Sequence, residues 1–168
     1  MAGGEGFQRG TDSKIAETAV YWLSIVGIYV LQGALWYYPF KEKVFDDGLT
    51  APAPIRDQFA GSLIDSFPGT SVSWGVLGLL QGVIVLVLAA SLVRGEFLPQ
   101  RRKPILLGAL ALSLVVFALL VFGESMTAEY DSVASLFTYF GITVVLMGFV
   151  RLMPPYRPLS WLSGLLER

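Results

Sequence analysis

The sequence predicts an all-α membrane protein, a bundle of four transmembrane helices with short interfacial helices. Its mean hydropathy is +0.63 and only 15% of its 168 residues are charged, which is too apolar for a soluble domain of this size. Four uncharged stretches, at 18–40, 66–93, 104–123 and 132–150, are each close to the roughly 20 residues that a helix needs to cross a bilayer. Polar stripes that would make these helices soluble are missing.

The first stretch predicts a retained helix over 18–40. Its apolar run is longer than the roughly 7–15 residues of a signal peptide, and Trp36 and Pro39 stand where small residues would precede a cleavage site. Pro68 and Gly69 favour a turn, so we expect the second helix over 71–93.

The third helix is expected over 104–123, because Pro104 suits the first turn, where its missing N–H is no loss. The fourth is expected over 132–150. Together these spans define a transmembrane domain over 14–153, preceded by a glycine-rich segment, 1–13, that is typical of a flexible tail.

Two segments outside the spans have amphipathic patterns. In the long loop 41–65, Ile55, Phe59 and Leu63 recur every four residues, which predicts a short helix that either lies on the outer headgroup layer or caps the bundle. The C-terminal segment 154–168 combines prolines with leucines and a tryptophan, which predicts a second interfacial segment.

Basic residues predict the orientation. Nine of the twelve Lys and Arg residues lie on the side that holds both termini, against three on the other, so the positive-inside rule favours cytoplasmic termini in a bacterial inner membrane. Interfacial aromatic belts are expected at Tyr21 and Trp22 on the inner side, and at Trp36, Tyr37 and Trp74 on the outer side.

The composition excludes several chemistries. With no Cys and no His, the chain has no disulfide, no thiolate or imidazole metal ligand and no His-dependent triad. A net charge of −1 argues against nucleic-acid binding. No ionisable residue lies at mid-depth in a span, which disfavours a proton pump or coupled transporter. We therefore predict that the protein has no catalytic residues, no metal site and no cofactor.

Two amides are the candidate ligand contacts inside the membrane. Gln32 and Gln81 both fall in the outer halves of their helices. They would either hydrogen-bond to each other across the helix pair or, with Trp36 and Trp74, line an outward-facing pocket for a lipid or quinone.

Small residues mark candidate packing faces. Gly75, Gly78 and Gly82 form one face of the second helix, and Gly141 and Gly148 form another on the fourth. Such spacing favours close helix association without specifying whether the neighbour belongs to the same chain or to a partner.

Acidic residues gather in the outer loops. Glu124, Glu129 and Asp131 lie between the third and fourth helices, and Asp46 and Asp47 lie in the first outer loop. Paired carboxylates bind Ca²⁺ or act as acid and base when their spacing is fixed. Without such spacing, we interpret these residues as solvated charges.

The arrangement resembles the DoxX-like family of small four-helix membrane proteins. The resemblance lies in Gly27 and Gly33 followed by Lys41, in the run 74–82 that opens the second helix, and in the basic hairpin before the third. It implies a four-helix bundle and, as in some members, association with respiratory or redox enzymes. This chain lacks the Arg at the start of the first helix and the acidic residue near Gln81 that members tend to carry.

Two functions follow as hypotheses. The first is a non-catalytic accessory or structural subunit that packs against a larger respiratory or envelope complex through its glycine faces. The alternative is a lipid- or quinone-binding protein with the outer pocket described above. An enzyme that uses the outer carboxylates is the least favoured, since no nucleophile or metal set is positioned.

Overall fold

A computed structural model describes residues 5–154 as helices joined by turns, which confirms the predicted all-helical membrane fold. Its elements are α1 (Glu5–Lys41), the π-helix η1 (Glu42–Asp46), α2 (Ala53–Phe59), α3 (Leu63–Ser66), α4 (Thr70–Val93), α5 (Pro104–Met126) and α6 (Tyr130–Leu152). The segment Ile15–Asp46 and helices α4, α5 and α6 are long and apolar enough to span a membrane. The predicted C-terminal interfacial segment lies outside the described residues, apart from Pro154.

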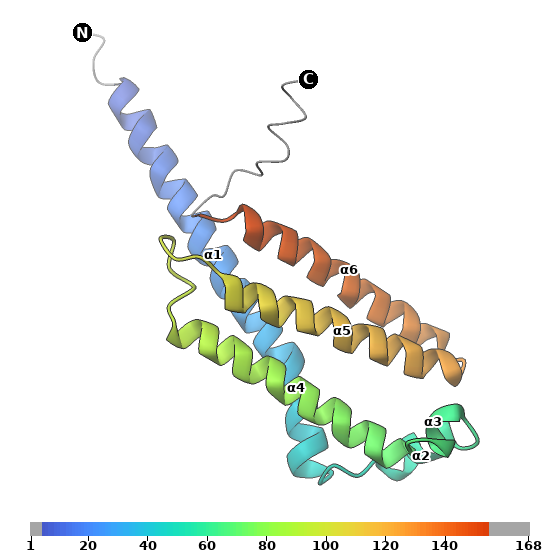
Figure 1. The fold of residues 1–168 in the computed structure, drawn as a ribbon. Helices are drawn as coiled ribbons and strands as arrows, with labels where there is room; N and C mark the ends of the chain where they lie inside the picture. The colour runs from blue at the N-terminus through green and yellow to red at the C-terminus, as the bar shows by residue number, and fades with distance from the viewer. Residues whose placement is uncertain (1–4, 155–168) are drawn as a thin grey trace, which may run out of the picture.

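The long helices form an open row rather than a closed ring. Figure 1 shows α4, α5 and α6 side by side and alternately antiparallel, with α1 crossing behind α5 and α4. Helix α5 packs against both α4 and α6, whereas α1 packs mainly against α4. The start of α1 and the end of α6 lie at one end of the molecule, the terminal end, and α2 and α3 lie at the other, the α2–α3 end. One side of α6 is consequently left open.

The first helix differs from its prediction at both ends. It begins at Glu5, so the helix also covers residues 5–13 of the segment that was expected to be a flexible tail. Extending an existing helix adds one hydrogen bond for each residue fixed. Near the other end Pro39 lies inside the helix and cannot donate a backbone hydrogen bond. Beyond Lys41 the chain continues as the π-helix η1, whose last turn closes when the Asp47 N–H donates to Glu42 O at 2.8 Å.

The amphipathic segment of the long loop is helical but divided. Helix α2 ends at Phe59 and α3 begins at Leu63. Between them Gly61 has a φ of +74°, in the left-handed region that glycine adopts without strain. Ser62 then caps α3 by accepting a hydrogen bond from Asp65 N at 3.2 Å. The single helix predicted over this segment is therefore two short ones.

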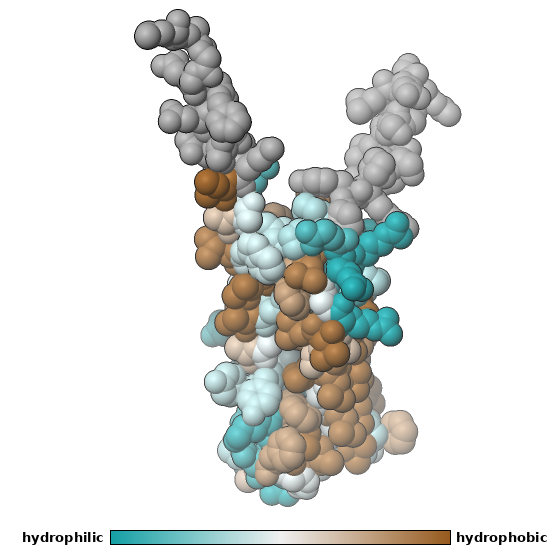
Figure 2. Space-filling model, turned by 90° about the vertical axis from the view of Figure 1, so that its left-hand side faces the viewer, coloured by the Kyte–Doolittle hydropathy of each residue, from teal (hydrophilic) through white to brown (hydrophobic). Residues whose placement is uncertain are grey.

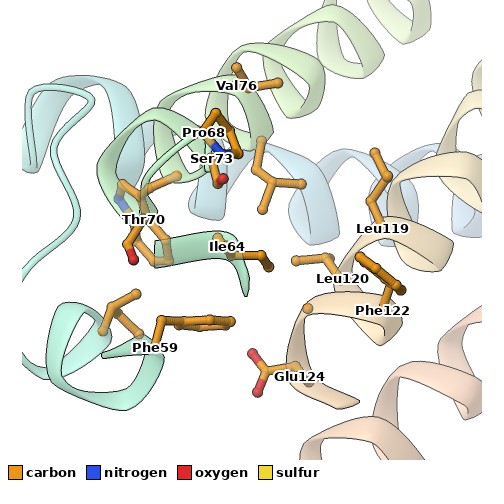
Figure 3. Close-up of a pocket in the computed structure, with 14 residues that line it drawn as sticks. Phe59, Ile64, Pro68, Thr70, Ser73, Val76, Leu119, Leu120, Phe122 and Glu124 are labelled. Atoms are coloured by element: carbon orange, nitrogen blue, oxygen red, sulfur yellow. The ribbon is translucent and has the colours of Figure 1, made fainter. Parts of the chain in front are cut away.

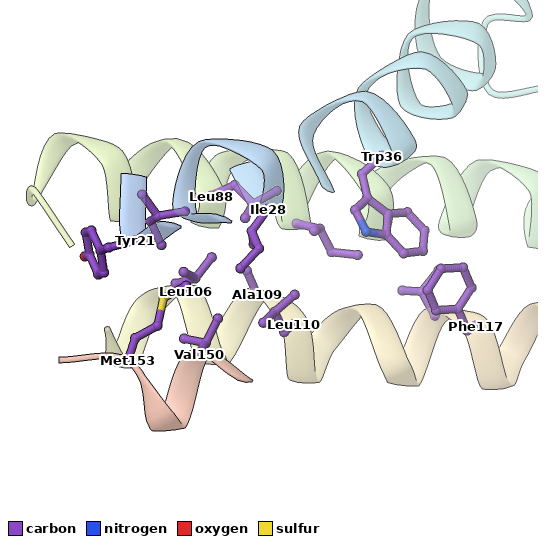
Figure 4. Close-up of a cluster of buried hydrophobic side chains, with 13 residues drawn as sticks. Tyr21, Ile28, Trp36, Leu88, Leu106, Ala109, Leu110, Phe117, Val150 and Met153 are labelled. Carbon is purple, nitrogen blue, oxygen red and sulfur yellow. The ribbon is translucent and has the colours of Figure 1, made fainter. Parts of the chain in front are cut away.

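The core lies where α1, α4 and α5 meet (Figure 4). Ile25, Ile84 and Leu110 are completely buried there. Trp36 also belongs to this core: it is 2% exposed and its ring centroid lies 4.8 Å from that of Phe117. The prediction that Trp36 sits in an interfacial belt is therefore wrong, because its position on α1 turns the indole toward α5 rather than toward the headgroups.

The surface is that of a protein surrounded by lipid. Figure 2 shows a broad hydrophobic area across the middle of one face, with hydrophilic residues gathered toward its upper right and lower left margins. Large apolar side chains such as Leu23, Val93 and Val145 are 70–89% exposed. Apolar exposure on this scale is tolerated in hydrocarbon and not in water.

Candidate functional site

The two intramembrane amides are both buried but do not pair. Gln32 is 1% exposed and Gln81 is 2% exposed. Gln32 Oε1 accepts a hydrogen bond of 3.2 Å from Trp36 Nε1, one turn along the same helix. Within residues 5–154, Gln81 Oε1 has no hydrogen-bond partner. The expected bond between the two amides is thus replaced by a local one in α1, and α4 retains an unpaired acceptor.

The two tryptophans that were expected to line one pocket with these amides lie in different surroundings. Trp36 is in the core, as described above. Trp74 Nε1 donates a hydrogen bond of 3.1 Å to Asp47 Oδ2, and Lys43 Nζ lies 3.9 Å from the Trp74 ring centroid. Trp74 thereby fastens the chain that follows η1 to the start of α4. Of the four predicted ligand contacts, only Trp74 lines the pocket described next.

A pocket of about 280 Å³ lies at the α2–α3 end, between α2, α3, α4 and α5 (Figure 3). Its walls are mainly apolar and include Phe59, Ile64, Leu77, Leu119, Leu120 and Phe122. Val76, Leu119 and Phe122 are 45–58% exposed, so the pocket opens sideways toward the lipid. The size approaches the lower bound of small-molecule sites. No sequence pattern indicated this pocket, because it is formed by the loop folding back over α4 and α5.

Polar groups of the pocket hold α2 and α3 in place. Gln58 Nε2 of α2 donates a hydrogen bond of 3.0 Å to Glu124 Oε2, in the last turn of α5. Thr70 Oγ1 donates to Asp65 Oδ1 at 3.3 Å, which joins α3 to α4. Glu124 and Thr70 line the pocket, so two carboxylates, those of Glu124 and Asp65, lie at or next to its edge.

The acidic loop residues do not form a cation site. Glu124 belongs to α5, whereas Glu129 and Asp131 are exposed around the start of α6. The Asp46 carboxylate forms an ion pair with Lys41 Nζ at 2.8 Å. Among the residues that the structure describes, no group of three Asp, Glu, His or Cys side chains could hold a metal ion.

The glycine face of α4 packs against residues of the same chain. A Cβ atom added at Gly82 would lie 2.6 Å from the Phe40 ring, and one added at Gly78 would lie 2.8 Å from Lys43 Cβ. At Gly75 it would lie 3.1 Å from the carbonyl oxygen of Leu49. These glycines therefore let the end of α1, η1 and the following loop approach the α4 backbone. The sequence had left the identity of this neighbour open.

The glycine face of α6 is open. Gly141 and Gly148 are exposed, and a Cβ atom added at either would meet no atom of residues 5–154 within 4 Å. They belong to a regular set of exposed residues at alternating spacings of four and three, formed by Ala134, Thr138, Gly141, Val145, Gly148 and Leu152. We call this set the open face of α6.

A second set on α6, at alternating spacings of three and four, is buried or half-buried on the opposite side: Val133, Leu136, Phe140, Thr143, Met147 and Val150. Because α6 packs mainly against α5, this set is the side that α5 occupies. The helix thus carries two faces with a seven-residue repeat. The one with the larger side chains packs against α5, and the one with the smaller side chains is exposed.

A buried polar network lies at the terminal end, and no sequence pattern predicted it. Glu96, in the turn between α4 and α5, is only 4% exposed. Its carboxylate accepts hydrogen bonds from the backbone N–H groups of Ile105 (3.0 Å) and Leu106 (2.8 Å), which are unpaired donors of the first turn of α5. Ser91 Oγ donates to the same carboxylate at 2.9 Å. Glu96 is therefore the N-terminal cap of α5, supplied from outside the helix.

The network continues into α1. Tyr29 Oη lies 2.6 Å from Ser91 Oγ, and since Ser91 donates to Glu96, Tyr29 donates to Ser91. A lone acid in an otherwise basic hairpin was the only signal in the sequence. No known spacing rule applies to it, because Glu96 stands nine and ten positions before the two N–H groups that it caps.

Lys103 closes the same end of the bundle. Its Nζ donates to Pro154 O at 2.7 Å and Arg101 O at 3.2 Å, and it lies 5.3 Å from the Tyr21 ring centroid. Burial lowers the pKa of Lys103, an effect that the negative charge of Glu96 opposes. Tyr21, predicted to be interfacial, is instead 9% exposed and donates to Phe97 O at 2.8 Å. These contacts join α1, the α4–α5 hairpin and the end of α6.

Comparisons with protein-family models, with curated proteins and with solved structures find no match to this chain.

Proposed function

We propose that the protein is a non-catalytic subunit of a larger membrane assembly, and that it binds a helix of another subunit through the open face of α6. Small residues recur along the whole membrane-spanning length of this face, from Ala134 to Gly148, and all of them are exposed. Lipid tails are as apolar as leucine, so helices associate in membranes mainly through close packing, which small residues permit.

The spacing of the open face specifies the geometry of such a contact. Alternating steps of three and four residues repeat every seven, a pattern that winds two helices around each other with a left-handed crossing of about +20°. The partner helix is therefore expected to run nearly parallel or antiparallel to α6 and to contact it from Ala134 to Leu152.

The glycines of α4 support this assignment by comparison. On α4 the small residues accommodate Phe40, Lys43 and Leu49 of the same chain. On α6, a Cβ atom added at Gly141 or Gly148 would meet nothing within 4 Å in the described part of the chain. A stripe of the same kind without an internal neighbour is what a subunit contact requires.

Charge supports the location. With nine basic residues on the terminal side and three on the other, we place both termini in the cytoplasm and the chain in a bacterial inner membrane. The alternative of a quinone at Gln32 and Gln81 has less support, because Gln32 and Trp36 hydrogen-bond to each other and neither lines the pocket.

The experiment compares glycine variants on open helix faces. Gly141→Leu combined with Gly148→Leu would fill the open face of α6, whereas Gly108→Leu on α5 and Gly27→Leu on α1 add the same side chain at positions that also meet nothing within 4 Å. Each tagged variant is purified from its native membrane in a mild detergent, and its mass is measured by native mass spectrometry.

We expect wild type and the two controls to co-purify with the same membrane subunit, and the Gly141→Leu, Gly148→Leu double variant to lose it while keeping its helical circular dichroism. A wild-type protein that elutes as a lone monomer, or a double variant that retains the subunit, would overturn the proposal.

A further inference from the structure

We propose that the pocket at the α2–α3 end is a lipid site that holds one acyl chain of a phospholipid with an amine headgroup, such as phosphatidylethanolamine. This ligand site is separate from the open face of α6: the pocket is lined by residues of α2 to α5 and the turn before α4, and none of these belongs to α6. The two proposals are therefore tested independently.

The apolar walls of the pocket indicate that its ligand is a hydrocarbon chain. A volume of about 280 Å³ exceeds the roughly 150 Å³ of an apolar cavity that stays dry and takes up benzene. Water would gain few hydrogen bonds against Phe59, Ile64 and Leu120, so hydrocarbon is the favourable occupant.

The direction of entry follows from exposure and depth. Three apolar lining residues, Val76, Leu119 and Phe122, are 50%, 45% and 58% exposed, so we infer that the pocket opens between α4 and α5. Val76 lies six residues into α4, or about 9 Å along its axis. The pocket therefore runs from the interface into the acyl-chain region, and a lipid beside α4 and α5 reaches it sideways with its headgroup still at the membrane surface.

The charged side chains near the pocket indicate which lipid headgroup it would favour. Glu124 lines the pocket and Asp65 hydrogen-bonds to Thr70 in its wall, so two carboxylates stand where the headgroup would lie. No Lys or Arg is among the described residues that line the pocket. An ammonium group is attracted to this edge, whereas the net negative charge of phosphatidylglycerol is repelled.

Gly123 offers a direct way to fill the pocket. A Cβ atom added there would lie 3.8 Å from Ile64 Cδ1 and 3.9 Å from Phe59, which is ordinary van der Waals contact. Gly123→Ala therefore fits without displacing its neighbours, and Gly123→Leu places its additional carbons in the space that the acyl chain would occupy.

Trp74 lines the pocket and serves as the reporter. Wild type, Gly123→Ala and Gly123→Leu are reconstituted into phosphatidylcholine vesicles that contain a minor fraction of either phosphatidylethanolamine or phosphatidylglycerol, each brominated on its acyl chains. Bromine quenches nearby indoles, and the same measurement on Trp74→Phe versions isolates the contribution of Trp74.

We expect Trp74 to be quenched by brominated phosphatidylethanolamine at about one-fifth of the concentration needed for phosphatidylglycerol, the factor expected when one unit charge differs near a membrane surface. Gly123→Ala should keep this preference and Gly123→Leu should lose the quenching. Equal quenching by both lipids, unchanged in Gly123→Leu, would show ordinary annular lipid and overturn the proposal.

A second variant covers the case in which Gly123→Leu does not fold. Glu124→Gln with Asp65→Asn removes both carboxylates and leaves the apolar walls unchanged. It should keep the quenching and lose the preference for the amine headgroup. A double variant that retains the full preference would contradict the assignment of the headgroup to these two side chains.

Discussion

Replacing Glu96 by alanine tests how much the capping network at the start of α5 contributes to stability. The Glu96 carboxylate accepts three hydrogen bonds, from the N–H groups of Ile105 and Leu106 and from Ser91 Oγ, at 2.8–3.0 Å. It also stands at the positive end of the α5 dipole. Because Glu96 is only 4% exposed, water has little access to these donors in the folded protein.

The size of the effect can be worked out from these contacts. Loss of an N-terminal cap costs about 0.5–2 kcal/mol, and loss of a partly buried charge at a helix end costs up to about 2 kcal/mol. Two buried N–H groups left without partners make the upper part of these ranges appropriate. Since the contributions overlap, we expect Glu96→Ala to lower the free energy of unfolding by about 3 kcal/mol. Glu96→Gln keeps one acceptor oxygen and should cost about half of that.

The assay is unfolding in mixed detergent micelles followed by far-ultraviolet circular dichroism. The matched control is Glu129→Ala, because Glu129 is also an acid at a helix N-cap but makes no side-chain capping bond. The control should change stability by less than about 0.5 kcal/mol. If Glu96→Ala behaves like Glu129→Ala, or if Glu96→Gln costs as much as Glu96→Ala, the capping explanation is wrong.

Three further predictions use the same assay. Gly78→Ala should lower the free energy of unfolding by about 1–3 kcal/mol, because the added Cβ atom would lie 2.8 Å from Lys43 Cβ. Gly141→Ala should leave the free energy of unfolding of the isolated chain unchanged or raise it. The reverse order would refute the packing assigned to α4. Gln81→Leu should stabilise the protein by about 1 kcal/mol, because it removes a buried acceptor without a partner in the described chain; a loss of stability would mean that a ligand or water pairs with Gln81. The pKa of Lys103 is below its ordinary value of 10.5 in the folded protein, so the unfolded chain binds that proton more tightly and the free energy of unfolding should rise with pH on the approach to 10.5; Lys103→Met should reduce this rise, and an unchanged slope would count against a buried ammonium.

The membrane-spanning segments were predictable because their cause is local. A charge in hydrocarbon costs about 2.5–3.5 kcal/mol wherever the chain places it, so the uncharged stretches fix the spans before any helix meets another. The structure begins α4 at Thr70 and α5 at Pro104, within one residue of the prediction. The proline and glycine signals at these positions act within a single turn, which explains their accuracy.

Contacts between segments were not predictable in this way. Gly82 and Gly141 look alike in the sequence, yet a Cβ atom added at Gly82 would clash with the Phe40 ring, whereas one added at Gly141 would meet no described residue within 4 Å. Trp36 has a sequence position that is typical of an interfacial residue. It nevertheless lies in the core, because its ring packs against that of Phe117 on α5.

The amino-acid sequence by itself determined the number of spans, the starts of α4 and α5 to within one residue and the uneven distribution of basic residues, since each depends on single residues and their transfer into lipid. Only the tertiary structure decided which glycines have another segment packed against them, how the loop encloses a pocket against α4 and α5, and that Glu96 caps α5. These features depend on which surfaces meet, and the periodicity of one helix carries no information about the shape of its neighbour.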